Sequence, residues 1–232
     1  MVHKVLVEPA FVLHSRPYRN TSLIIDVFTE HHGRQALVAR SARGTKSRYQ
    51  GRLQAFVPLV ISYSGQHELK NLSAAELAAT PYDLVGNHMM CGFYLNELLV
   101  RLLQKGDEHH RIYQRYKLTL QALTQQRQVE VALRLFEKTL LIELGYGLNL
   151  SSDAVTSLPL DSHASYRFVP EQGFVLLQQP VAADDVFVGA SILALRDECW
   201  SSAEQLSDAK RLMRSVLAYY LGSRPLKSRE CL

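Results

Sequence analysis

The chain has 232 residues, 47% of them hydrophobic and 21% charged, and its formal net charge is +4. This composition supports a packed core and excludes wholesale disorder and a fibrous, collagen-like chain. No stretch approaches the ~20 apolar residues of a membrane-spanning helix, and Glu8 and Pro9 interrupt the apolar run at the start before it resembles a signal peptide. We therefore expect a soluble, cytoplasmic protein. Its length predicts one large or two modest domains.

The positive charge is unevenly distributed along the chain. Residues 1–80 contain ten Lys or Arg and five Asp or Glu, a net charge of +5, whereas the remainder has a net charge of −1. Residues 34–52 and residues 210–229 each hold six basic side chains and no acid. A solvated basic face is the alternative, but such faces normally mix both signs. The distribution therefore favours a polyanionic partner.

The first 75 residues show the two-residue period of β-strands. Gly33 and Gly65 lie in predicted turns, where glycine tolerates a positive φ. The predicted strands cover residues 10–13, 23–27, 35–40, 56–63 and 69–72. These short strands, with one pair joined by a long basic loop, predict a small closed barrel rather than a βαβ unit.

After Pro81 the hydrophobic period becomes that of a helix. A first helix is predicted to run to about Lys105, with an apolar stripe of Met89, Phe93, Leu98, Leu99 and Leu102. Further helices are predicted over residues 112–123, 129–144, 192–196 and 206–220. We therefore predict an α+β protein: a barrel domain over 1–80, then a helical domain over 81–232 interrupted by a loop-rich insertion, 146–190, with one hairpin at about 166–177.

Enzymatic and metal-binding motifs are absent from the sequence. The scattered cysteines, Cys91, Cys199 and Cys231, lack the spacing of a zinc site. Four of the nine histidines form two adjacent pairs, 31–32 and 109–110. Adjacent side chains point apart on a strand or helix, so neither pair alone can bind one metal ion. We expect no metal, no cofactor and no catalytic residue, hence a non-enzyme. A nuclease using one of the acid pairs (107–108, 184–185 or 197–198) is the alternative.

The basic stretch over residues 34–52 is the strongest candidate site. Its cations can neutralise phosphates by releasing counterions, and interleaved aromatic rings can stack on bases. Tyr49 lies between Arg48 and Arg52, and Tyr18 lies between Arg16 and Arg19. For both tyrosines, packing in the barrel core is the alternative. The predicted DNA-binding residues are Arg34, Arg40, Arg43, Lys46, Arg48, Tyr49 and Arg52, with Lys210, Arg211 and Arg214 from the second basic stretch. Binding of structured RNA is an alternative function.

A second candidate site lies on the predicted helix over residues 129–144. Arg134 follows the core position Leu133, and Lys138 is one turn further along. A guanidinium beside apolar surface can grip the carboxylate of a short acidic, hydrophobic peptide. The alternative is an ordinary surface arginine whose stem covers apolar surface.

Several runs of this sequence resemble the RecO family of bacterial recombination mediators. They include AFVLHSRPY at residues 10–18, GFYLNEL at 92–98, ALRLFE at 132–137 and RPLKSRE at 224–230. Similar matches occur at residues 21–23, 26–30, 33–34, 37–39, 53–59 and 144–147. Together they span nearly the whole chain.

The resemblance implies an N-terminal OB-fold barrel, a helical domain, and a protein that binds single- and double-stranded DNA and anneals complementary strands. It implies as partners the acidic C-terminal tail of single-stranded-DNA-binding protein (SSB), RecR and, indirectly, RecA, in RecF-pathway repair at the nucleoid. Carried onto this chain, residues 34–52 would contact DNA, and Arg134 would lie with Leu133 and Lys138 in the SSB-tail pocket. We expect a monomer.

The sequence departs from the family pattern in one place. Many relatives carry a four-cysteine zinc module after the Gly-Tyr-Gly segment, whereas residues 148–153 here read LNLSSD. We therefore expect the insertion to be held without metal, by packing alone.

Overall fold

The computed structural model describes residues 4–45, 47–224 and 226–228. The described residues form two compact units, one of residues 4–127 with 226–228 and the other of residues 128–224. The first unit holds the strands β1 (Lys4–Tyr18), β2 (Ser22–Thr29), β3 (Gly33–Ala39), β4 (Leu59–Ser64) and β5 (Leu69–Leu77), and the helices α1 (Gly86–Leu102) and α2 (His110–Gln125). Contacts thus group α1 and α2 with the barrel, and the predicted division at residue 80 stays a prediction.

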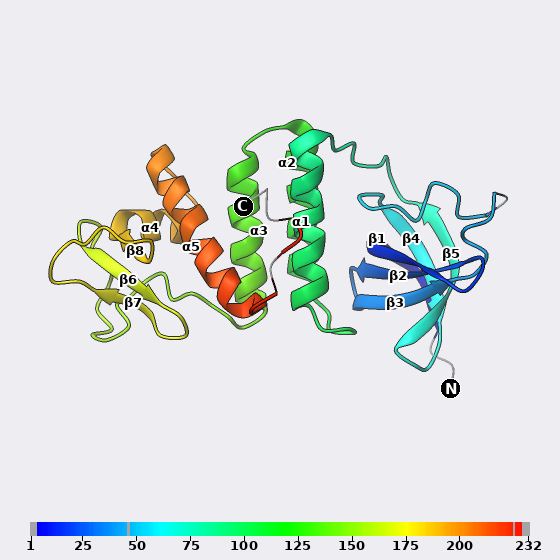
Figure 1. The fold of residues 1–232 in the computed structure, drawn as a ribbon, viewed down its shortest axis with the longest axis horizontal. Coiled ribbons are helices and arrows are strands. Elements are labelled where there is room, and N and C mark those ends of the chain that lie inside the picture. Colours follow the sequence, from blue (N-terminus) through cyan, green and yellow to red (C-terminus); the bar gives the residue numbers. More distant parts are fainter. Residues whose placement is uncertain (1–3, 46, 225, 229–232) are drawn as a thin grey trace. The chain divides into compact units, whose positions relative to one another are not determined.

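The strands β1 to β5 close into a barrel in the order β1-β2-β3-β5-β4, as Figure 1 shows. Neighbouring strands are antiparallel except for β3 and β5, which are parallel. Alternate side chains such as Ile25, Val27, Leu37 and Ile61 fill the interior and are fully buried. The predicted barrel is confirmed, and its closing strand extends to Leu77.

An aromatic cluster packs the helices of the first unit against β1 and β2. The Phe11 ring lies 5.7 Å from that of Tyr113 and 5.2 Å from that of Tyr116, between ring centroids. The Tyr116 hydroxyl donates to Asn96 over 2.6 Å, and the Asn96 amide donates to the Leu13 carbonyl over 3.1 Å. Burial raises the pKa of Tyr116 well above its usual value.

The predicted apolar stripe of α1 is partly wrong. Leu98 and Leu99 are buried as expected, but Met89 and Phe93 are 40% and 42% exposed. The buried face instead uses Cys91, Gly92, Tyr94, Leu95 and Asn96. A pattern of apolar residues does not identify Asn96 as buried. Its amide is buried because both its oxygen and its nitrogen are hydrogen-bonded.

The turn between β2 and β3 packs tightly against the chain that precedes α2. Gly33 has φ +60°, and a Cβ atom there would lie 1.7 Å from the Asp107 carbonyl oxygen. The Gly106 amide donates to the Arg34 carbonyl over 2.9 Å, beside a parallel bridge between Arg34 and Lys105. Only glycine lets the Asp107 carbonyl approach position 33 this closely, so Gly33 fixes the start of α2 against the barrel.

The second unit holds α3 (Val129–Glu143), β6 (Ser165–Val169), β7 (Gly173–Leu176), β8 (Val186–Val188), α4 (Gly189–Asp197) and α5 (Ala203–Leu221). The strands form a small antiparallel sheet with β6 in the middle, and β6 and β7 are the predicted hairpin. Helix α5 packs against α3 and α4, and the Ser202 hydroxyl caps its first turn. Among the described residues, no helix is both long and apolar enough to cross a membrane.

We expect Gly33→Ala to destabilise the protein by about 3 kcal/mol, because it adds a steric clash to a left-handed backbone conformation. Denaturant unfolding of the full chain measures the loss. The matched control is Gly51→Ala, where φ is +72° but nothing lies within 4 Å of the added methyl group. The control should lose only about 1 kcal/mol. Equal losses in the two variants would contradict the role given to the close approach at Asp107.

Candidate nucleic-acid interface

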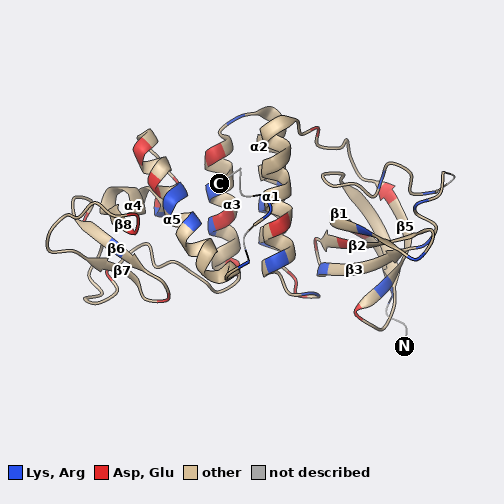
Figure 2. Ribbon diagram, in the orientation of Figure 1, with Lys and Arg blue, Asp and Glu red and all other residues tan. Residues whose placement is uncertain are grey.

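Exposed arginines gather where two connections of the barrel meet. The loop between β3 and β4 is tied to the turn between β1 and β2 by the Arg43 amide, which donates to the Thr21 carbonyl over 2.9 Å. Figure 2 shows basic residues along this loop. We call the exposed arginines of the end of β1, the turn after it and this loop the barrel basic surface: Arg16, Arg19, Arg40, Arg43 and Arg48. Three of these were predicted DNA contacts, and the structure adds Arg16 and Arg19.

Tyr49 is part of the barrel core rather than this surface. The ring is only 3% exposed, and its hydroxyl donates to the Leu72 carbonyl over 3.3 Å. The Arg48 guanidinium lies 4.8 Å from the ring centroid and donates to the hydroxyl over 2.6 Å. The alternative of barrel packing therefore describes the position of Tyr49, because its ring and hydroxyl both have partners within the protein, and stacking of a base on it stays a prediction.

Arg34 and Arg52 hold the fold together instead of facing solvent. The Arg34 guanidinium donates to the Val100 carbonyl near the end of α1. The Arg52 guanidinium donates to the Ala75 carbonyl of β5 over 3.1 Å. Both side chains are half-buried, and their assignment as phosphate contacts stays a prediction. Lys46, the remaining predicted contact of this stretch, lies outside the described residues.

In the second basic stretch, Arg211 is also a structural residue. Its guanidinium donates to the carbonyls of residues 183, 184 and 186 and to the Asp208 carboxylate, which lies 2.7 Å away. It also lies 4.3 Å above the Phe187 ring. It therefore fastens the start of β8 to α5. Lys210 is half-buried and Arg214 is exposed, so these two residues remain candidate contacts.

The predicted peptide-binding residues on α3 are already engaged within the second unit. Arg134 is 2% exposed, and its guanidinium donates to the buried Glu137 carboxylate over 2.6 Å. Leu133 is 3% exposed. The Lys138 ammonium caps the end of α4 by donating to the carbonyls of Leu195 and Arg196, and it pairs with Glu198 over 2.9 Å. The structure thus pairs Arg134 with Glu137, while Nε of Arg134 is buried without a hydrogen-bond partner among the described residues.

Polar side chains hold the segment that follows the Gly-Tyr-Gly run at residues 145–147. The Asn149 amide oxygen accepts the backbone N–H groups of Ser151 and Ser152. The Asp153 carboxylate accepts those of Val155, Thr156 and Leu176. Burial opposes ionisation of Asp153, yet these hydrogen bonds hold its pKa below the usual value. Side-chain hydrogen bonds therefore hold this segment, and the absence of a metal from it stays a prediction.

A polar anchor that the sequence analysis missed holds the last described residues to α1. The Glu97 carboxylate accepts the backbone N–H groups of Lys227 and Ser228 over 2.9 and 3.0 Å, and the Ser228 hydroxyl over 2.8 Å. Although burial raises the pKa of Glu97, these hydrogen bonds bring it below the usual value. Both partners lie in runs that carried the resemblance, but nothing in the sequence indicated that the two runs meet.

Comparison with known proteins gives matches over almost the whole chain. The family described as "Recombination protein O N terminal" matches residues 4–81, and "Recombination protein O C terminal" matches residues 85–230. The chain is 49% identical to the DNA repair protein RecO of Coxiella burnetii (strain RSA 331 / Henzerling II), with all of both chains covered. It is 42% identical to the DNA repair protein RecO of Polynucleobacter asymbioticus, with 99% of this chain and 96% of that relative covered.

Proposed function

Because the chain belongs to the RecO family of DNA repair proteins, we propose that it binds single- and double-stranded DNA and anneals complementary strands without catalysing a reaction. The observation that carries the proposal is the barrel basic surface. Its arginines are exposed, come from two connected segments and lie on an OB-like barrel. Such a surface suits an extended phosphate backbone better than a single small anion.

In the proposed mechanism, affinity for DNA and sequence specificity come from different interactions. Arginines of the barrel basic surface neutralise phosphates without reading bases, while base pairing between two bound strands supplies the specificity. Holding both strands on cations lowers their mutual repulsion during pairing. The half-buried ring of Tyr18, with the Arg19 guanidinium 5.2 Å from its centroid, is the aromatic group placed to stack on a base. Lys46, Lys210 and Arg214 are proposed as further contacts.

We also propose that this protein acts on SSB-coated DNA at the nucleoid, as a monomer, and with RecR allows RecA to load. Family membership supports this part of the proposal. The SSB tail is proposed to bind at Arg134, beside Leu133 and Lys138. Because Arg134 is paired with Glu137, we propose that a tail carboxylate takes the place of the Glu137 carboxylate on the guanidinium.

The first functional prediction concerns salt. If four or five arginines contact single-stranded DNA, log affinity should fall with log salt concentration with a slope of roughly −3. The combined Arg16→Ala, Arg40→Ala and Arg43→Ala variant should bind at least tenfold more weakly on every sequence, with a slope shallower by about 2. Arg48 is left in place because it contacts Tyr49. Fluorescence anisotropy over a salt series measures both quantities.

Arg196→Ala is the control for this experiment, because that exposed guanidinium already binds its neighbour Asp197 over 2.7 and 2.9 Å. Its affinity for DNA should equal that of the wild type. A wild-type slope near zero would contradict the electrostatic mechanism. Loss of binding on one sequence only would instead indicate base readout, which the proposal does not include.

The second functional prediction uses variants with opposite expected effects. Glu137→Gln removes the competing charge, so an acidic SSB-tail peptide should bind about tenfold more tightly, whereas Arg134→Gln should weaken binding by a similar factor. Both changes leave a buried group without its charged partner and should lower stability. A general folding defect therefore cannot produce the opposite shifts. Unchanged peptide binding in both variants, measured by anisotropy, would place the tail elsewhere.

A further inference from the structure

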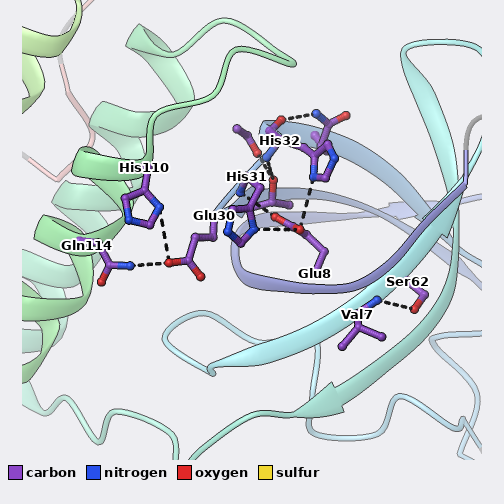
Figure 3. A network of polar contacts seen from close by, with 11 residues as sticks. Val7, Glu8, Glu30, His31, His32, Ser62, His110 and Gln114 are labelled. Carbon is purple, nitrogen blue, oxygen red and sulfur yellow. Dashed lines mark hydrogen bonds and ion pairs between the residues drawn. The ribbon is translucent and has the colours of Figure 1, made fainter.

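The fold brings one histidine from each adjacent pair to the same place. His31 lies in the turn after β2, and His110 is the first residue of α2. The Glu30 side chain reaches between them, and Figure 3 shows its carboxylate beside both rings. One ligand atom from each of Glu30, His31 and His110 lies within 4.8 Å of the others. The cluster takes one histidine from each of the pairs 31–32 and 109–110, so neither pair indicates it by itself.

The separations in this cluster suit ligands that share an ion. The Nδ1 atom of His110 lies 3.6 Å from Oε1 of Glu30, which is long for a hydrogen bond. Two ligand atoms at metal distances of 2.0–2.1 Å in a tetrahedral site are roughly 3.3 Å apart. The rings of His31 and His110 are 6.1 Å apart between centroids, and their side chains are 54% and 50% exposed. Small rotations of exposed side chains therefore complete the geometry.

Buried and half-buried neighbours orient two of the three candidate ligands. Glu8 is 4% exposed, and its Oε2 atom lies 3.3 Å from Nδ1 of His31 while its Oε1 atom accepts the His31 backbone N–H over 2.7 Å. Because Glu8 engages Nδ1, the other ring nitrogen of His31, Nε2, is the atom available to an ion, as in many metal-bound histidines. The Gln114 amide donates to Glu30, so that carboxylate is also held.

We propose that Glu30, His31 and His110 bind a divalent transition-metal ion of the zinc type, with water in the remaining position. Two imidazoles and one carboxylate suit zinc or cobalt, whereas magnesium and calcium require oxygen ligands. The ligands come from the turn between β2 and β3 and from α2, both in the first unit. The ion would therefore stabilise the contact that Gly33 makes with the chain before α2. This site is independent of the proposed DNA function.

The test uses the untagged full chain after removal of metals with a chelator. Co²⁺ titration followed by visible absorption, with Zn²⁺ competition, should give one site per chain. The His31→Ala/His110→Ala variant should bind at least tenfold more weakly. The matched control is His163→Ala, since the His163 side chain is 94% exposed and lies in the other unit. The control should bind as the wild type does.

Thermal unfolding supplies a second measurement. At a hundredfold excess over the wild-type dissociation constant, Zn²⁺ should raise the melting temperature of the wild type by roughly 5 °C and that of the double variant by no more than about half as much. Circular dichroism checks that the variant is folded, as expected for two half-exposed side chains. Failure of the wild type to bind either ion, or equal binding by the double variant, would overturn the proposal and leave the cluster as carboxylate–histidine pairs.

Discussion

The contact between the turn after β2 and the chain before α2 determines much of the first unit. Gly33 allows the Asp107 carbonyl to approach, the Gly106 amide donates to the Arg34 carbonyl, and the Arg34 side chain reaches the Val100 carbonyl. This contact fixes the start of α2, whose tyrosines then pack on Phe11 and Phe28. It also brings His31 and His110 together. The same backbone arrangement thus supports the barrel–helix packing and the proposed metal site.

The basic residues have two different roles, and burial separates them. Arg34, Arg52 and Arg211 donate to backbone carbonyls, so their charges stabilise local structure. The arginines of the barrel basic surface are exposed, so desolvation does not oppose their contact with phosphate. Each of the two acid-free stretches contains both kinds of arginine, and a count of charges along the sequence does not separate them.

The sequence predicted the barrel, the hairpin and the helices well, because their signals are local periods of apolar residues. It did not predict which arginines are free, since the carbonyls that accept from Arg34 and Arg52 are 66 and 23 residues away in the chain. The burial of Asn96 likewise depends on its partners in β1 and α2. Clustering of His31 with His110 required the tertiary fold, which two adjacent pairs in a sequence do not reveal.

The central claim is that the barrel basic surface brings complementary strands together on SSB-coated DNA. The most direct test is the annealing rate of complementary strands precoated with SSB, measured with intact SSB and with SSB lacking its acidic tail. We expect fast annealing by the wild type with intact SSB, slow annealing without the tail, and little annealing by the Arg16→Ala, Arg40→Ala and Arg43→Ala variant on either. Wild-type annealing rates in that variant would show that the barrel basic surface does not bring the strands together.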